Sequence, residues 1–194
     1  MATVVHFMTE RRATQDAPPR VFTVGHSTRD FVELLVMLRA NGVTDLVDVR
    51  SFPSSRKYPQ WNQDAITEAL PADIRYRWIR ELGGRRYTPA ERTSPNAAWR
   101  VKAFRDYADH MSTDEFRAGL AVLLEMANES TPAIMCSEAV PWRCHRRLIT
   151  DALIVEGVEV FDVMSVSTTR RATLSNFAQV SDGKITYPPP VGDR

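Results

Sequence analysis

The sequence predicts a three-layer, Rossmann-like α/β fold, with a mostly parallel sheet of about five strands and helices on both faces. Short β-branched runs alternate with segments of helical periodicity over residues 21–163. The first strand, helix and strand together span about 30 residues, the size of a right-handed βαβ unit. A length of 194 residues with 43% hydrophobic and 25% charged residues fits one globular domain.

The individual elements follow from local patterns. Thr28 or Asp30 can cap the first helix, and Asn41-Gly42 can end it. Residues 74–79 alternate polar and apolar side chains, which is typical of a strand with one solvated face. In chain order we expect strands at 21–25, 43–49, 74–79, 131–135 and 158–163, and helices at about 30–40, 62–70, 97–110, 114–127 and 142–156.

Loops and tails complete the predicted organisation. Residues 51–62 contain two prolines and should form a loop, and Gly83-Gly84 open a second polar loop that extends to about residue 96. Residues 1–20 are expected to be a flexible lead-in. Residues 164–194 show little periodicity and are expected to be a loose C-terminal tail, which leaves 21–163 as the domain.

Composition excludes several classes of protein. Lys and Arg number 25 against 24 Asp and Glu, so no overall field favours nucleic acid or a membrane surface. No apolar stretch approaches the roughly 20 residues of a membrane span, and the N-terminal residues lack the apolar core of a secretory signal. Two cysteines cannot form a disulfide scaffold, so a reduced, cytoplasmic setting is expected. The oligomeric state is not indicated.

Chemically reactive side chains follow three of the predicted strands. The strand ends carry Gly25-His26-Ser27, Asp48-Val49-Arg50 and Cys136-Ser137-Glu138. Ligands of open parallel sheets bind at the carboxyl ends of the strands, so these groups predict a shared site. A structural interpretation of each group is also open: a helix cap at His26, a buried ion pair of Asp48 with Arg50, and a core residue at Cys136.

Residues 135–153, MCSEAVPWRCHRRLITDAL, form the richest segment. The predicted helix begins with Arg143, Arg146 and Arg147, and this Arg-rich first turn favours anion binding. The same field would stabilise a Cys144 thiolate. Catalysis by Glu138, Cys144 or His145 and a purely structural helix start both remain open. A metal site of Cys136, Cys144 and His145, with or without His26, is disfavoured, because adjacent helical residues diverge by about 100° and the C-x7-C-H spacing matches no familiar zinc pattern. A Cys136–Cys144 redox pair lacks the C-x-x-C spacing.

The segments VFTVGHST, DVRSFPSS, ELGGRRY and MCSEAVPWRCHRR together resemble the bacterial and archaeal domain-of-unknown-function family numbered 488. The resemblance covers about residues 21–163. It implies an enzyme-like protein with no assigned reaction, and it assigns no role to a single residue. The motif positions are Gly25, His26, Ser27, Asp48, Arg50, Pro53, Leu82, Gly83, Gly84, Cys136, Glu138, Cys144, His145 and Arg146.

Residues 75–105 are locally basic and interleaved with aromatic residues, a pattern that single-stranded nucleic acid or an exposed base could use. The competing interpretation is that the arginine stems cover apolar surface and pair with carboxylates elsewhere. The loop Gly83-Gly84-Arg85-Arg86 suits closure over an anionic ligand. Neither the P-loop nor the dinucleotide-binding glycine pattern is present.

The function predicted from these observations is an enzyme, a hydrolase or transferase, acting on a small anionic substrate that bears a phosphate or nucleotide. Glu138 is the expected general acid–base or nucleophile and Cys144 the alternative nucleophile, with His26, His145 and Asp48 as further catalytic residues. The expected binding residues are Ser27, Arg50, Gly83, Gly84, Arg85, Cys136 and Arg146. No cofactor and no metal are expected. The alternatives are a nucleic-acid-binding or base-processing protein and a cysteine-based redox or metal-binding protein.

Overall fold

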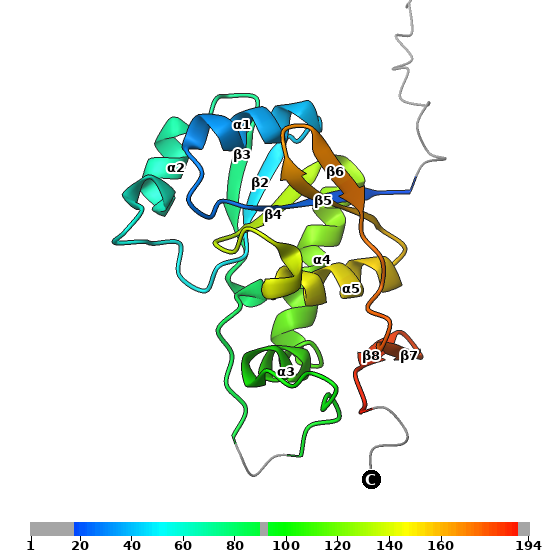
Figure 1. The fold of residues 1–194 in the computed structure, drawn as a ribbon. Coiled ribbons are helices and arrows are strands. Elements are labelled where there is room, and N and C mark those ends of the chain that lie inside the picture. The colour runs from blue at the N-terminus through cyan, green and yellow to red at the C-terminus, as the bar shows by residue number, and fades with distance from the viewer. Residues whose placement is uncertain (1–17, 90–92, 190–194) are drawn as a thin grey trace, which may run out of the picture.

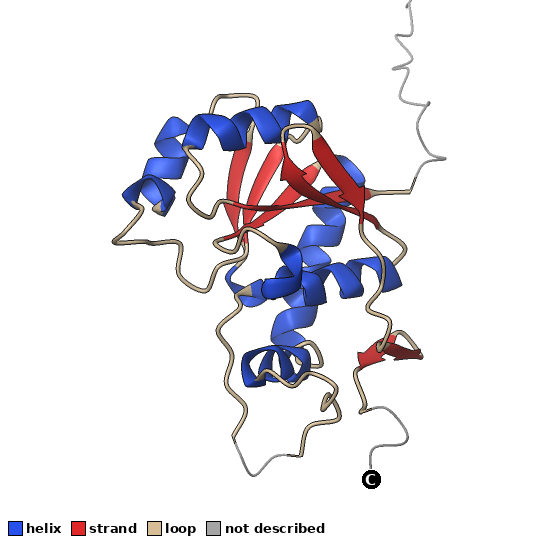
Figure 2. Ribbon diagram, in the orientation of Figure 1, coloured by secondary structure: helices blue, strands red, loops and turns tan. Residues whose placement is uncertain are grey.

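A six-stranded sheet forms the centre of the protein, seen in red in Figure 2. The computed structural model describes residues 18–89 and 93–189. The strands are β1 (Arg20–Gly25), β2 (Asp45–Asp48), β3 (Arg75–Trp78), β4 (Pro132–Cys136), β5 (Glu159–Ser165) and β6 (Thr168–Arg171). Their order is β3-β2-β4-β1-β5-β6, and every neighbouring pair is parallel except β5 with β6. The predicted mostly parallel sheet is confirmed. It has a sixth strand, β6, which was not predicted and which pairs antiparallel with β5 at the edge of the sheet.

Helices cover both faces of this sheet, so the three-layer prediction is confirmed. The helices are α1 (Phe31–Ala40), α2 (Gln63–Ala69), α3 (Lys102–His110), α4 (Asp114–Glu129) and α5 (Arg146–Val155). In Figure 1, α1 and α2 lie on one side of the sheet, and α4 and α5 lie on the other. Short 3-10 turns are η1 (Pro59–Trp61), η2 (Arg80–Leu82) and η3 (Pro141–Arg143).

Each face of the sheet has its own hydrophobic core. Leu46 and Met135 join the core beneath α1, whereas their chain neighbours Val47 and Ile134 join the core beneath α4 and α5. Successive side chains of a strand point to opposite faces, so the central residues of a strand covered on both sides are apolar on both faces, as Leu46 and Val47 of β2 are, while the buried Asp45 and Asp48 at its two ends are paired with arginines. The fully buried patterns of β2 and β4 are the result.

The ends of α1 agree with the sequence signals. The Asp30 carboxylate accepts a hydrogen bond of 2.7 Å from the Glu33 backbone N–H, which caps the helix. At the other end Gly42 has a φ of 66°, a left-handed conformation that glycine adopts without steric cost.

The helix expected at 142–156 begins later than predicted, and this correction matters for the site. Pro141 starts the η3 turn, which closes when the Cys144 backbone N–H donates to the Pro141 carbonyl at 2.9 Å. Cys144 itself has φ −132° and ψ 147°, an extended conformation, and α5 starts only at Arg146. Similarly, the helix expected from residue 97 begins at Lys102.

The loose tail expected after residue 163 is wrong for residues 164–189. β6 adds to the edge of the sheet, and β7 (Gln179–Ser181) pairs with β8 (Lys184–Thr186) in a small hairpin. Tyr187 is fully buried, and its hydroxyl donates to an Asp151 carboxylate oxygen at 2.9 Å. Buried side chains of this kind tie the segment to the core despite its weak periodicity. Most of the expected lead-in, residues 1–17, lies outside the described residues.

Within the described residues, we find no helix that is long and apolar enough to span a bilayer.

Candidate active site

A cleft of about 730 Å³ opens where the carboxyl ends of β1 and β4 meet. Two hydrogen bonds of 3.0 Å extend the pairing beyond the strands, from His26 N–H to the Cys136 carbonyl and from Ser27 N–H to the Ser137 carbonyl. The predicted site residues that line the cleft are His26, Ser27, Arg50, Gly84, Arg85, Cys136, Glu138, Cys144 and His145. Asp48, Gly83 and Arg146 do not line it. The structure therefore brings most of the predicted set together.

Gly25 permits the close approach of the two strand ends. A Cβ atom at this position would lie 1.9 Å from the Glu138 carbonyl oxygen, well inside any possible contact. The chain leaving β4 thus passes directly over the end of β1. The absence of a side chain at Gly25 is what allows Glu138 to reach the rim of the cleft.

Arg50 is held in place by the strand and loop around it. Its Nε donates to both Asp48 carboxylate oxygens, at 2.9 and 3.0 Å, and its Nη2 donates to the Trp61 carbonyl at 2.8 Å. The Tyr76 hydroxyl donates to the same carboxylate at 3.0 Å. Burial would lower the pKa of Arg50, but the hydrogen bonds and charge of Asp48 outweigh it and raise the pKa. Asp48 therefore orients Arg50 from behind and does not face the cleft.

His26 is a neutral imidazole that accepts from Arg50. Its Nδ1 lies 3.1 Å from the Ser27 carbonyl and must donate to it, which leaves Nε2 to accept from Arg50 Nη1 at 3.3 Å. The ring stacks on Trp61 with centroids 4.6 Å apart. Burial and the positive charge of Arg50 lower the pKa of His26 to about 4.

Cys136, Cys144 and His145 form a second group, called the Cys–His cluster below. His145 Nε2 lies 2.8 Å from the Val49 carbonyl and must donate to it, so Nδ1 faces the thiols and carries the lone pair when the ring is neutral. That Nδ1 lies 3.6 Å from Cys144 Sγ and 3.8 Å from Cys136 Sγ. The cluster joins the end of β4 to the start of α5.

The two thiols of the Cys–His cluster differ in pKa. The hydrogen bond to Cys144 and burial raise the pKa of Cys136 to about 12. Burial alone would raise the pKa of Cys144, but the hydrogen bond from Cys136 and the charge and hydrogen bonds of Arg146 lower it to about 6.

Arg146 faces inward, contrary to its expected role in binding an anion. Its side chain is 1% exposed. Nε donates to Cys144 Sγ at 3.4 Å, Nη1 to Thr23 Oγ1 at 3.1 Å and Nη2 to the Glu138 carbonyl at 2.6 Å. With its donors engaged by the protein, Arg146 positions the Cys–His cluster and the Glu138 backbone.

Sequence reasoning missed several residues that line the cleft. Arg143 is not one of them, because it belongs to the predicted anion-binding turn; the η3 turn separates it from α5 and leaves it exposed at the cleft. Ser51 contributes from the loop after β2 and accepts a hydrogen bond of 2.7 Å from the Arg85 backbone N–H. Phe52, Tyr58 and Phe104 add apolar surface.

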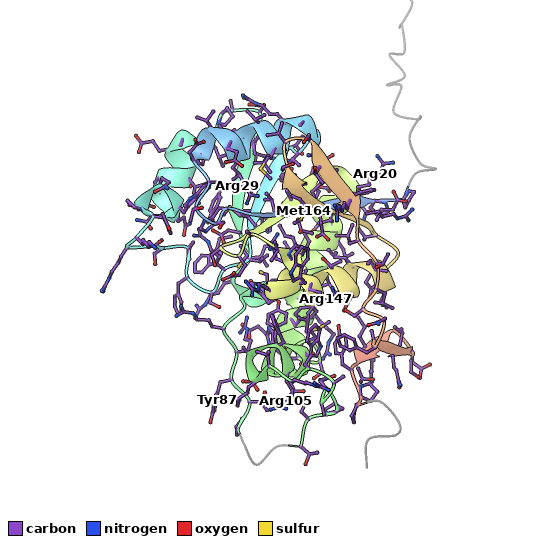
Figure 3. All side chains as sticks on the ribbon, in the orientation of Figure 1. Arg20, Arg29, Tyr87, Arg105, Arg147 and Met164 are labelled. Atoms are coloured by element: carbon purple, nitrogen blue, oxygen red, sulfur yellow. The ribbon has the colours of Figure 1, made fainter. Side chains whose placement is uncertain are left out.

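Part of the basic and aromatic segment 75–105 is engaged by the fold. Arg86 pairs with Glu115 at 2.9 Å and Lys102 with Asp106. Trp99 is buried in the core, whereas Tyr87, which is labelled in Figure 3, is 77% exposed. Arg86 and Lys102 thus pair with carboxylates as the structural interpretation expects.

Gly84→Ala is expected to disturb the Cys–His cluster more than the fold. A Cβ at Gly84 would lie 2.4 Å from His145 Nδ1, so the loop or the imidazole must move. We expect an overpacking cost of about 1–3 kcal/mol in urea denaturation, together with faster labelling of the two buried thiols by a disulfide reagent.

The matched control for this change is Gly42→Ala, where a Cβ would meet nothing within 4 Å. It should cost stability through its positive φ and leave thiol labelling unchanged. Equal labelling rates in the Gly84→Ala variant and the native protein would contradict the assigned contact.

The comparisons with known proteins bear on the family alone. No curated protein and no solved structure matches the chain. The profile of a family described as "Domain of unknown function DUF488" matches residues 29–153. The match begins just after Gly25-His26-Ser27 and contains the residues of the other three motifs. Because the matched region covers more than half of the chain, this protein belongs to the DUF488 family.

Proposed function

We propose that the protein is an enzyme that acts on a small anionic substrate, bearing a phosphate or nucleotide, bound in the cleft at the carboxyl ends of β1 and β4. The observation that carries the proposal is the charge of the cleft lining. Arg50, Arg85 and Arg143 line it, against Glu138 as the lining carboxylate among the described residues. His26 adds no charge because its pKa is lowered.

The three arginines contribute differently to this charge. Arg50 is already neutralised by Asp48, so it offers directed N–H groups and no net charge. Arg85 and Arg143 are exposed, and no ion pair of either is found among the described residues. Arg85 lies over the Phe52 ring at 5.7 Å, which holds its guanidinium beside the cleft. These two residues are therefore the source of the attraction for an anion.

Two sets of groups could supply the chemistry beside the bound anion. Glu138 is exposed at the rim, and no hydrogen bond of its carboxylate is found among the described residues, so it is available to accept or donate a proton. The Cys–His cluster lies at the buried end of the same cleft. A polar, proton-transferring rim and a reactive inner end suit a hydrolase or a transferase.

Replacing both Arg85 and Arg143 by Gln is expected to weaken the binding of inorganic phosphate to the full chain about tenfold or more. Hydrogen bonds to charged groups contribute about 1.5–3 kcal/mol each, and partial exposure reduces that value. Isothermal titration calorimetry of the native protein and the variant measures the change.

Arg77→Gln is the matched control, because Arg77 is exposed on β3 and does not line the cleft. Its phosphate binding should equal that of the native protein. Equal binding by the Arg85/Arg143 variant would contradict the proposal.

Gel shifts of a single-stranded oligonucleotide at two salt concentrations check the remaining nucleic-acid hypothesis, which requires binding that weakens steeply with salt.

A further inference from the structure

We propose that Cys136, Cys144 and His145 bind a divalent metal ion of the Zn²⁺ type, with a fourth coordination position that opens into the cleft. This inference deepens the proposed function, on which it rests for the role of the metal, because it names a cofactor beside the bound anion. The reasons are the spacing of the three donor atoms, the tautomer of the imidazole, the conformation of Cys144 and the opening of the cluster onto the cleft.

The spacing of the donor atoms matches tetrahedral coordination. Zn–S distances of about 2.3 Å and Zn–N distances of about 2.0–2.1 Å place a sulfur and a nitrogen about 3.6 Å apart around one ion. His145 Nδ1 lies 3.6 Å from Cys144 Sγ and 3.8 Å from Cys136 Sγ. All three donor atoms lie within 4.8 Å of one another. Small shifts of the side chains would complete the geometry.

The imidazole already has the tautomer that a metal requires. His145 Nε2 donates to the Val49 carbonyl at 2.8 Å, which directs the lone pair of Nδ1 toward the two sulfurs. Metal-binding histidines commonly use their second nitrogen in this way, to fix the orientation of the ring. Arg146 Nε donates to Cys144 Sγ at 3.4 Å, a contact that would support a thiolate ligand.

Of the two sequence arguments against a metal, the unfamiliar C-x7-C-H spacing and a helical Cys144, the structure removes the second. Cys144 is extended and His145 precedes the first residue of α5, so their side chains do not follow helical geometry. The change of backbone direction between them allows adjacent residues to face one point. Cys136 reaches the same point from the end of β4.

The charges also balance. Cys136 and Cys144 are 7% and 2% exposed, and two thiolates at such positions would be costly to bury without a cation. When a divalent ion binds, both sulfurs bind as thiolates, any proton that they still carry is released, and their two negative charges neutralise the ion. The neutral His145 supplies the third electron pair.

The fourth position belongs to the cleft. All three residues of the Cys–His cluster line it, and no fourth His, Cys, Asp or Glu joins them among the described residues. Three protein ligands with one open position are typical of catalytic zinc, where a water molecule or a substrate oxygen completes the tetrahedron. An anion held by Arg85 and Arg143 would reach the ion from this side, which would let the ion act as a Lewis acid.

Cobalt alone is the probe that tests this site. The full chain, reduced and stripped with a chelator, is titrated with Co²⁺, after a thiol assay has counted both cysteines as free. We expect one equivalent to bind, with a thiolate-to-cobalt charge-transfer band and the strong visible bands of tetrahedral Co²⁺. Added Zn²⁺ should abolish both signals. If the native protein has two free thiols and no charge-transfer band, the proposal is wrong.

Variants assign the ligands. Cys136→Ser and Cys144→Ser should each reduce the charge-transfer band and weaken Co²⁺ binding about 100-fold or more, since even supporting contacts outside the ligand set are worth about 10–100-fold. His110→Gln is the matched control, because His110 is buried outside the Cys–His cluster and should leave the spectrum unchanged. An unchanged spectrum in the double serine variant would place the ion elsewhere and overturn the assignment.

The Arg85/Arg143 variant separates this inference from the proposed function. It should keep the Co²⁺ spectrum while it loses phosphate affinity. Phosphate binding without a Co²⁺ spectrum would refute the metal site and leave the anion site intact. A Co²⁺ spectrum in a protein that binds phosphate equally well with and without these arginines would refute the anion site and support the metal site.

Discussion

Asp48→Asn is expected to lower the free energy of unfolding by about 3–5 kcal/mol, because it leaves the Arg50 guanidinium buried without a counter-charge. Asp48 is 0% and Arg50 7% exposed, so water cannot replace the lost partner. Asn can still accept a hydrogen bond from Arg50, but its amide would present N–H groups where the guanidinium and the Tyr76 hydroxyl now donate. Urea denaturation followed by circular dichroism measures the loss.

Asp73→Asn is the matched control for Asp48→Asn. Asp73 pairs with Arg39 at 2.9 Å, but both side chains are more than half exposed. Surface pairs contribute little, so the urea midpoint should hardly change. A comparably small change for Asp48→Asn would show that the pair is solvated in the folded protein. Phosphate binding by the Asp48 variant should also weaken, because Arg50 loses the group that orients it.

Trp61→Ala should also cost about 3–5 kcal/mol, the range for removing a large buried aromatic side chain. Trp61 is 0% exposed and joins the core beneath α1. Its indole also supports the His26 ring, with centroids 4.6 Å apart. The Ala variant should therefore lose both stability, seen in urea denaturation, and the fixed orientation of His26 beside Arg50.

Trp61→Phe provides the matched comparison. Trp61 Nε1 is buried without a hydrogen-bond partner among the described residues. Burying this unpaired N–H lowers the stability of the folded protein, and phenylalanine, which has no such group, removes that cost. Phenylalanine also retains an aromatic surface for His26. Trp61→Phe should thus be clearly less destabilising than Trp61→Ala. Equal losses of unfolding free energy in the two variants would show that the indole nitrogen or the full volume of the indole ring is required.

Local patterns identified which residues would meet, because parallel strands place their carboxyl ends at one edge. His26, Arg50 and Cys136 were predicted at this edge from the ends of three separate runs, and each lines the cleft. The cap of α1 at Asp30 was equally accessible, since capping depends on residues within one turn. These features follow from short-range periodicity and from the topology of an alternating α/β chain.

The roles of several residues depended on contacts between distant segments. Arg146 has a sequence environment typical of an anion-binding turn, yet it reaches Thr23 on β1, 123 positions away, and faces inward. No local pattern indicates this contact. The segment after residue 163 looked unstructured because weak periodicity does not show that Tyr187 is buried against Asp151.

The sequence by itself determined the α/β class, most of the parallel strands and the set of chemical groups at their ends, because each depends on residue type and short spacing. The tertiary structure decided how those groups are used. It turned Asp48 and Arg146 toward the interior, directed Nδ1 of His145 at two sulfurs and left Arg143 at the cleft. Those outcomes depend on which distant atoms form hydrogen bonds with each buried donor and acceptor, and these atoms come together only in the folded chain.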